Sequence, residues 1–543
     1  MKVQNQPKQQ ENRFNYSNLY VDFLNGDEKI RKFLPEASPV RVAPQVVDTP
    51  FDRDVLCEIL NRQNEHYKAG EKTFEAIEQL RRSNAVCVFT GQQVGMYGGP
   101  LFTLYKAAGI VRKAEELQKE LNRPVVPVFW LAADDHDFEE INHFHYFEKD
   151  GSAGKMIYKA APSDGLPVSE ISFNDSELYA EFVEKTKEVF GESDFTERMY
   201  ERLFRAYAPD SSMVDAFARY FFSIFPDSGL IMFSPADTEV KKRSRRFFQR
   251  IVEQYFNLKT LLEQTDTLLE MDGYHIQAEK KLTAVHLFYH DPERKPIHFA
   301  DNSFLVGEKM IGQPGLLDLI ERNPEKFSPD VLTRPIWQSY LFPVVAHAGG
   351  PSEIAYFCQI SQLFKPFKLT QPYCFARPTA TLVEKHHEEL MEKHHLSLED
   401  LTGDVELLIN RLLGGYFPED TEEKLNQLRR KLNGDYKEMA RLIIDFDVAL
   451  KPMTEQTYGK VDFALNALEN KVFDRHKKHM KNTRSQVYRL AAALYPYNNL
   501  QERSYNINYY ISKYGVGIVD YIINSLNYIK TDHKLIHMSQ YKG

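Results

Sequence analysis

The sequence predicts an α/β fold built on a parallel sheet, and three neighbouring features carry this prediction. Two continuously apolar runs, AVCVFT from Ala85 and VVPVFWLAA from Val125, are typical of short buried strands. Between them, a glycine-rich turn leads into apolar residues at helical spacing from Leu101 to Leu121. Strand, turn, helix and strand form a βαβ unit, and continuous rather than alternating hydrophobicity indicates parallel strands covered on both faces.

The rest of the first 383 residues is expected to leave this core and return to it. Residues 151–225 are polar and helical, as in an insertion, and SGLIMFSPAD (228–237) has the pattern of a strand that rejoins the sheet. The stretch from 283 to about 309 alternates like antiparallel strands, with turns at DPERKP and ADNS. Short apolar runs between 330 and 380 indicate returning core elements, and the aromatic-rich residues after 500 should pack back on the core.

Residues 384–494 differ in kind, because apolar side chains recur at steps of three and four with charged residues between them. This pattern predicts two long helices in an antiparallel hairpin, separated near KPMTEQTYG (451–459), with part of the apolar stripe left for a partner. The stripe consists of Leu425, Leu428, Leu432, Met439, Leu442, Phe446, Ala449 and Met453, followed by Val461, Leu465, Leu468 and Val472.

Composition excludes several function classes. The net charge of −9 over 543 residues argues against a general nucleic-acid binder, which needs a basic face. No run of about eighteen apolar residues occurs and the N-terminus is polar, so we expect no membrane span and a cytoplasmic protein. The four cysteines form no CxxC pair, so neither a disulfide framework nor a structural zinc is expected.

The glycine-rich turn, TGQQVGMYGGPLFTLY (90–105), is the first candidate binding element. A helix N-terminus presents unpaired N–H groups, and glycines would let an anionic ligand approach them closely. The spacing fits neither a P-loop nor a dinucleotide fingerprint, and Lys106 is expected to face away from a ligand at the helix tip. Packing of a tight turn is the alternative. The candidate ligand-binding residues are Gly91, Gln92, Gln93, Gly95, Gly98, Gly99 and Pro100.

The second candidate element, AADDHDFEEINH (132–143), follows the next strand. Ligands of open α/β sheets bind beyond the carboxyl ends of the strands, so Asp134, Asp135, His136 and Asp137 should face the same crevice as the glycine turn. Such acids could hold Mg²⁺ or grip and deprotonate an amine, and His136 could act as a base. Helix capping is the alternative. The spacing of the histidines at 136, 143 and 145 does not predict a metal site.

A third element repeats the Gly-Gly-Pro pattern at a second helix start, in HAGGPSE. Its candidate residues are Gly349, Gly350, Pro351, Ser352 and Glu353, although Glu353 also suits a plain capping role. Arg377 in FARPTAT could bind a carboxylate or phosphate, or be an ordinary surface residue. The basic run KKRSRR (241–246) is interpreted as a solvated helix face.

Four segments together resemble the family of cysteine ligases of bacillithiol biosynthesis, the BshC family. They are FTGQQVGMYGGPLFTLYKA, VPVFWLAADDHDFEEINH, AHAGGPSEIAYF and QERSYNINYYISKYG, and the resemblance runs from about residue 85 to the C-terminus. It implies a Rossmann-like core akin to class I aminoacyl-tRNA synthetases, two connecting-peptide insertions and a helical coiled-coil domain that mediates dimer formation. The HIGH and KMSKS signatures of those synthetases do not occur in this sequence.

The resemblance further implies a ligase that joins cysteine to the amine of glucosaminyl-malate. The alternative is a nucleotide-binding scaffold or regulatory protein of thiol metabolism without ligase activity of its own. Activation of cysteine by ATP with Mg²⁺ is expected, with Arg377 or Arg334 on the malate carboxylates and a possible second nucleotide site at Gln501 and Arg503. The expected domains are a Rossmann-like core at 1–150, 227–237 and 283–383, insertions at 151–226 and 238–282, a helical domain at 384–500 and a returning segment at 501–543.

Overall fold

A computed structural model of the chain describes residues 14–34, 38–46, 48–148, 150–159, 165–279, 281, 283–414, 421–528 and 532–543. The chain divides into two compact units. The first, here called the sheet unit, comprises Met1–Glu148, Ala153–Val383 and Leu500–Gly543. The second, the helical unit, comprises Lys149–Ser152 and Glu384–Asn499, close to the 384–500 expected for a helical domain.

The sheet unit is built on a five-stranded parallel sheet, which confirms the predicted fold class. The strands stand in the order β12-β11-β1-β2-β5. Their bounds are β1 (Val86–Gln92), β2 (Val125–Leu131), β5 (Ile231–Phe233), β11 (Val344–Gly349) and β12 (Tyr373–Ala376). Every residue of β2 and β5 is buried, as their continuous hydrophobicity predicted.

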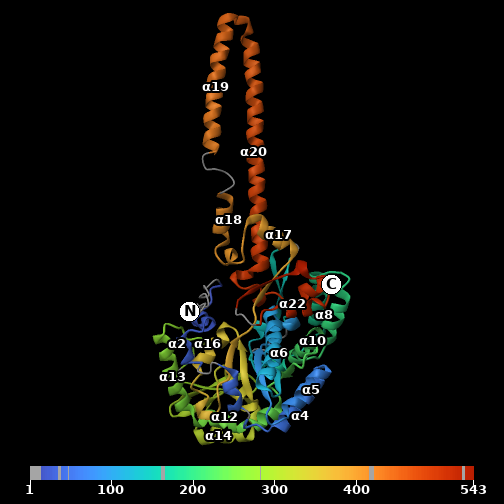
Figure 1. Cartoon of the computed structure of the whole chain (residues 1–543), viewed down its shortest axis with the longest axis vertical. Coiled ribbons are helices and arrows are strands. Elements are labelled where there is room, and N and C mark those ends of the chain that lie inside the picture. The colour runs from blue at the N-terminus through green and yellow to red at the C-terminus, as the bar shows by residue number, and fades with distance from the viewer. Residues whose placement is uncertain are drawn as a thin grey trace, which may run out of the picture. The chain divides into compact units, whose positions relative to one another are not determined.

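Helices cover both faces of this sheet, so its strands contribute to two separate apolar cores. Helices α6 (Leu101–Leu121) and α10 (Met213–Ile224) pack in one core (Figure 1). Helices α4 (Arg53–His66), α5 (Glu71–Leu80) and α16 (Pro351–Gln359) pack in the other. Helix α6 has the predicted bounds, with Pro100 as its N-cap rather than its first residue.

The connections create a topological switch point between β1 and β11. From β1 the chain passes through α6 to β2, whereas β11, on the other side of β1, leads into α16. Because α6 and α16 cover opposite faces, their N-terminal ends diverge above the carboxyl ends of β1 and β11. Open α/β sheets bind ligands at such a position.

The predicted antiparallel strands form a second sheet, in the order β10-β6-β7-β8-β9. They are β6 (Ala284–His290), β7 (Arg294–Ala300), β8 (Ser303–Val306), β9 (Lys309–Ile311) and β10 (Phe327–Pro329). Residues 283–329 therefore do not extend the parallel core, which the chain rejoins only at Val344.

The remaining elements of the sheet unit surround these two sheets. The region after β2 contains a β3–β4 hairpin and several helices. The C-terminal segment packs in the same core as α6, and its strand β14 pairs in parallel with β13 in a separate two-stranded sheet. The bounds are α1 (Asn18–Asn25), α2 (Glu28–Arg31), α3 (Pro39–Val42), α7 (Phe138–Ile141), β3 (His143–Phe147), β4 (Ala153–Ile157), α8 (Ser176–Phe190), α9 (Thr196–Ala206), α11 (Thr238–Arg243), α12 (Arg245–Glu253), α13 (Tyr255–Met271), α14 (Gln313–Arg322), α15 (Arg334–Leu341), β13 (Ala380–Val383), α21 (Asn508–Tyr514), α22 (Ile518–Ser525) and β14 (Lys534–His537).

The helical unit contains the predicted hairpin, formed by α19 (Thr421–Phe446) and α20 (Lys451–Leu494), together with α17 (Lys385–His394) and α18 (Val405–Gly414) (Figure 1). Its break was predicted too late in the chain. The turn lies at residues 447–450, where the Asp447 carboxylate accepts the N–H of Ala449, and Pro452 fits the first turn of α20.

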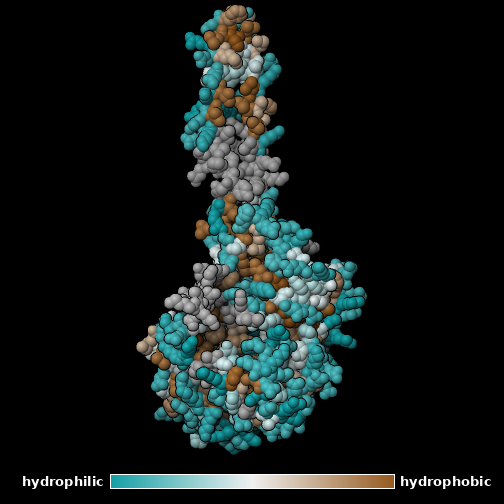
Figure 2. Space-filling model, in the orientation of Figure 1, coloured by the Kyte–Doolittle hydropathy of each residue, from teal (hydrophilic) through white to brown (hydrophobic). Residues whose placement is uncertain are grey.

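Much of the predicted apolar stripe is exposed on this hairpin (Figure 2). Phe446, for example, is 87% exposed. Its exposed members are Leu428, Leu432, Met439, Leu442, Phe446, Met453, Val461 and Leu468. The side chains of Leu425 and Val472 lie outside the described part of the chain. Nowhere in that part does a helix have a stretch that is long and apolar enough to span a bilayer.

Candidate functional site

The glycine turn is more tightly packed than a phosphate cradle would be. Gly98 and Gly99 adopt φ of +89° and +73°, which favour glycine. The Gly98 N–H donates to Tyr207 Oη (3.3 Å), and the N–H of Leu101, the first residue of α6, donates to the Tyr505 carbonyl (2.9 Å). At Gly98 and Gly99 the packing alternative therefore holds, and the expectation of bare amides at this helix start is wrong.

The C-terminal segment fastens the same turn. The Asn506 side-chain amide donates to the carbonyl oxygens of Tyr97 (2.9 Å) and Gly99 (3.0 Å), and Asn506 forms an isolated β-bridge with Pro100. Gly95 is also buried, against the backbone of Gly99. The C-terminal segment therefore helps to fix the conformation of the glycine turn.

The beginning of the turn lies at the strand end and remains accessible. Gly91 and Gln92, the last two residues of β1, and Gln93 directly after it are half-buried. Lys106, expected to face away, instead points back along α6, and its ammonium donates to the Gly91 carbonyl (2.8 Å) and to Gln92 Oε1 (2.9 Å). The helical side-chain direction explains this, because long side chains lean toward the helix N-terminus.

Lys106 also joins the two sides of the switch point. Its Nζ lies 2.7 Å from Glu353 Oε2 on α16, and Glu353 accepts the Gly350 N–H at 2.9 Å, so the predicted capping role is present as well. Burial alone would raise the pKa of Glu353, but Lys106, His347 and the Gly350 amide hold it below its usual range. The Gly349–Glu353 element therefore meets the glycine turn at one sheet edge, with Pro351 and Ser352 opening α16.

The acidic element lies beside this edge, because β2 pairs with β1 and the Ala132 N–H donates to the Gln92 carbonyl. Asp134 Oδ1 lies 2.7 Å from Lys241 Nζ, and Asp135 Oδ2 lies 3.0 Å from an Arg334 nitrogen. Burial would raise the pKa of Asp135, but Arg334 and Arg294 together keep it lowered. The solvated-face interpretation of KKRSRR is thus wrong at Lys241, whose side chain is buried.

Arg294 is a site residue that the sequence did not reveal. Its guanidinium donates to Ser328 Oγ (3.0 Å), to the Pro329 carbonyl (3.2 Å) and to His136 Nδ1 (3.3 Å), and it lies over the Phe288 ring at 3.7 Å. All three acceptors are neutral. Among the residues that the structure describes, no carboxylate lies within ion-pair distance of Arg294, although Asp135 and Asp134 act on its charge from farther away.

The remaining predicted site residues, Asp137, Arg377, Gln501 and Arg503, do not take part in this charged cluster. Asp137 is largely exposed, with Oδ1 3.9 Å from His136 Nε2. Arg377 is buried rather than a surface residue, and it pairs with the buried Glu502 at 2.7 Å. Gln501 is fully buried and uses both ends of its amide on the backbone of Leu382 (2.8 and 3.0 Å), whereas Arg503 is exposed, so Gln501 is structural rather than a nucleotide ligand.

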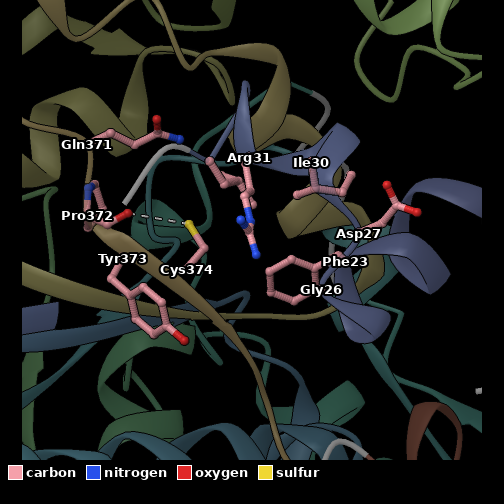
Figure 3. A pocket seen from close by; sticks show the side chains of 10 residues that line it. Phe23, Gly26, Asp27, Ile30, Arg31, Gln371, Pro372, Tyr373 and Cys374 are labelled. Carbon is pink, nitrogen blue, oxygen red and sulfur yellow. Dashed lines mark hydrogen bonds between the residues drawn. The ribbon is translucent and has the colours of Figure 1, made fainter. Parts of the chain in front are cut away.

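A cavity of about 210 Å³ lies elsewhere, beside the amino end of edge strand β12 (Figure 3). It is lined by Arg31 and Cys374 among others, and Cys374 Sγ contacts the Pro372 carbonyl at 3.7 Å. Burial raises the pKa of this thiol well above its usual value, so Cys374 is not poised as a nucleophile. The cavity is at the wrong edge of the sheet to belong to the candidate site.

A possible metal-ligand group exists in the helical unit. Glu384, His386 and His387 offer ligand atoms that lie within 4.8 Å of one another. In the described ranges, His136, His143 and His145 do not form such a group. His143 instead bonds the Glu139 carbonyl (3.0 Å), and burial lowers the pKa of His145 to about 4.

The fold and the site define an α/β protein of the Rossmann-like class, with a cluster of charged side chains at the carboxyl edge of its sheet and a long helical hairpin. Comparison with known families gives the same architecture. Residues 1–378 match the N-terminal Rossmann-like domain of BshC in bacillithiol biosynthesis, and residues 380–538 match its C-terminal coiled-coil domain. The chain belongs to the BshC family.

Relatives extend along nearly the whole chain. The sequence is 30% identical over 534 residues to a protein of Salinibacter ruber, covering 96% of each chain. It is 30% identical over 511 residues to one of Bacillus cytotoxicus, covering 92% of this chain and 94% of the relative. It is 32% identical over 469 residues to one of Desulforamulus reducens, covering 86% of each. All three carry the name "Putative cysteine ligase BshC".

Proposed function

We propose that this protein is a ligase that joins the carboxyl group of cysteine to the amine of glucosaminyl-malate, forming bacillithiol. The names of its relatives support this proposal. The observation that carries it is the cluster of charged side chains that includes Asp134, Asp135 and Arg294, beside the carboxyl ends of β1 and β2. Such a site can hold a zwitterionic amino acid and a polyanionic acceptor together.

Arg294 is the proposed anchor for a substrate carboxylate. Its planar guanidinium matches a carboxylate with two parallel hydrogen bonds, and, unlike Lys241 and Arg334, it is not within ion-pair distance of either acid. It takes the role that the sequence suggested for Arg377, whose charge is neutralised by Glu502. Arg334 instead pairs with Asp135 and holds this carboxylate in place to face the cysteine ammonium.

The carboxylates at 134, 135 and 137 are proposed to bind the substrate amine. Asp134 and Asp135 each contribute one oxygen to a cation, which leaves the second oxygen for an ammonium group. Asp137 is open to solvent at the rim. We propose that these carboxylates orient the substrate amine rather than remove its proton.

Activation of the carboxylate is a necessary part of this reaction, because a free carboxylate does not condense with an amine at neutral pH. We propose ATP with Mg²⁺ as the activating co-substrate. The amides of Gly98 and Leu101 do not fit a phosphate cradle, since both are already bonded, so cationic side chains such as Arg294 are the better phosphate partners. Gln92 and Gln93 lie at the accessible end of the turn.

We further propose that the exposed apolar stripe of the hairpin pairs with a second copy of the chain. Leucine, methionine and phenylalanine side chains exposed at coiled-coil spacing are stabilised when a partner helix covers them. Sedimentation should give a dimer, and replacing Leu432 and Phe446 with Glu should give a monomer.

The function is tested by incubating the purified full-length protein with cysteine, glucosaminyl-malate and ATP-Mg²⁺, and following bacillithiol, AMP and ADP by mass spectrometry. Reactions that omit one component, and a parallel reaction with the Asp135→Asn variant, serve as controls. Bacillithiol that depends on all components supports the ligase. Nucleotide binding without product would instead favour a non-catalytic scaffold of thiol metabolism.

A further inference from the structure

We propose that His286, held by Asp330, is the base that accepts the proton of the attacking amine, and that the cavity beside it receives the amino sugar. This inference rests on the proposed ligase function. It assigns a base that lies outside the acidic element at 134–137.

His286 and Asp330 form a buried pair with fixed geometry. His286 Nδ1 lies 3.0 Å from Asp330 Oδ2, and the two side chains are 4% and 3% exposed. The other oxygen of Asp330 accepts the backbone N–H groups of Leu332 and Thr333, each at 3.0 Å. The carboxylate therefore cannot rotate without losing these bonds, and it fixes the orientation of the imidazole.

The backbone at His286 is also unusual. His286 adopts φ of +62° within β6, where the pairing with β7 is irregular between Ala284 and Phe288. A non-glycine residue in this conformation is strained, and such strain clusters at functional sites. The Thr333 hydroxyl, which donates to the His286 carbonyl at 2.7 Å, helps to hold the strained backbone.

The partners of the two candidate histidines determine which one can act as a base. A guanidinium only donates hydrogen bonds, so the contact with Arg294 requires His136 Nδ1 to be the acceptor, and its basic lone pair is already engaged. A carboxylate only accepts, so His286 Nδ1 carries the hydrogen and Nε2 carries the lone pair. Of these two histidines, His286 is the one with the tautomer of a carboxylate-oriented general base.

A cavity beside His286 offers room for a substrate amine. His286 and Asp330 line a cavity of about 250 Å³, whose other walls include Leu287, Ile297 and the exposed Lys281. Phe288 lines the same cavity, and its ring lies under the Arg294 guanidinium and 6.2 Å from the His136 ring. Phe288 thus borders both the cavity and the charged cluster around Arg294.

This adjacency suits an amine that must reach an activated carboxyl group. The attacking nitrogen is an ammonium in solution, and one N–H bond must break before it becomes a nucleophile. The proton passes to His286 Nε2, the electron pair stays on the amine nitrogen, and the Asp330 carboxylate stabilises the imidazolium. Lys281 and Arg294 provide cations for the malate carboxylates on either side of Phe288.

The decisive variant is His286→Asn in the full-length protein, because asparagine tolerates a positive φ. We expect a 10²- to 10⁴-fold loss of kcat for bacillithiol formation, the usual contribution of a general base. The wild-type rate should fall on acidification as one group takes up a proton, and the variant should lack this limb. Free imidazole should restore part of the lost rate.

His290→Asn is the matched control, since His290 lies on the same strand but bonds the partly exposed Glu170 (2.7 Å). It should retain the wild-type rate and acidic limb. Wild-type protein that forms no bacillithiol would overturn the ligase proposal and this inference together. Active wild type with an unchanged rate and pH profile in His286→Asn would overturn this inference alone.

Discussion

The ion pair between Lys106 and Glu353 makes a strong prediction about stability, because it joins α6 to α16 across the switch point. The Lys106 ammonium has three partners at 2.7–2.9 Å, and the two side chains are only 4% and 17% exposed. Replacing Lys106 with Met keeps the side-chain length but leaves the carboxylate without its cation. Breaking a buried ion pair from one side costs about 3–5 kcal/mol of unfolding free energy.

We expect a loss near 3 kcal/mol, the lower end of that range, because Glu353 retains the Gly350 N–H. The double variant Lys106→Met/Glu353→Gln should recover most of the loss, since no unpaired charge remains. Arg112→Met is the control on the same helix. It breaks an exposed pair with Glu115, which is worth less than about 0.5 kcal/mol.

The assay is urea unfolding followed by tryptophan fluorescence. The sequence contains two tryptophans, Trp130 and Trp337, and both are buried in the sheet unit, so the signal reports that unit alone. A Lys106→Met variant as stable as the wild type, or a double variant no more stable than the single one, would refute the view that this pair holds the switch point together.

Four further results are expected. Gly98→Ala should destabilise the sheet unit by about 1–2 kcal/mol, as judged by the same fluorescence assay, because alanine disfavours φ of +89°, and an unaltered midpoint would contradict this. Asn506→Leu should lose about 1–3 kcal/mol, with and without substrate, because it removes the donor to the buried Gly99 carbonyl and the acceptor of the Asn508 N–H, whereas the Tyr97 carbonyl keeps the Asn508 amide. Asp135 and Glu353 have a lowered pKa in the folded protein, so their ionised carboxylates stabilise the fold fully above the usual values near 4, and this stability is lost as the pH falls through the lower folded values. The urea midpoint should therefore be lower at pH 3 than at pH 6. Arg294→Gln should raise KM for glucosaminyl-malate about 10- to 100-fold, or about 1.4–2.7 kcal/mol, with little change in KM for cysteine, and an equal rise for both would argue against the carboxylate anchor.

The fold class was predictable because its signals are local. Continuous hydrophobicity in β1 and β2, the intervening helix from Leu101 to Leu121, and the heptad-like spacing of the hairpin all appear within a single window of sequence. Which strand ends meet was also predictable, since parallel neighbours share an edge. The break was predicted near 451–459 but lies at residues 447–450, since Pro452 belongs to the first turn of α20, where proline fits.

The site was only partly predictable, because its charges are neutralised by residues distant in sequence. Lys241 and Arg334 reach Asp134 and Asp135 from helices 100 or more residues away, and no periodicity marks them. The glycine turn misled for a related reason. Its amides are bonded by Tyr207 and Tyr505, which only the folded chain brings to them.

The most direct test is a crystal structure of the full-length protein with cysteine and glucosaminyl-malate bound. Both substrates should lie beyond the carboxyl ends of β1 and β2, with a malate carboxylate on Arg294 and the sugar nitrogen within hydrogen-bond reach of His286 Nε2. Substrate density at the amino end of the sheet, or in the helical unit alone, would contradict this assignment of the reaction site.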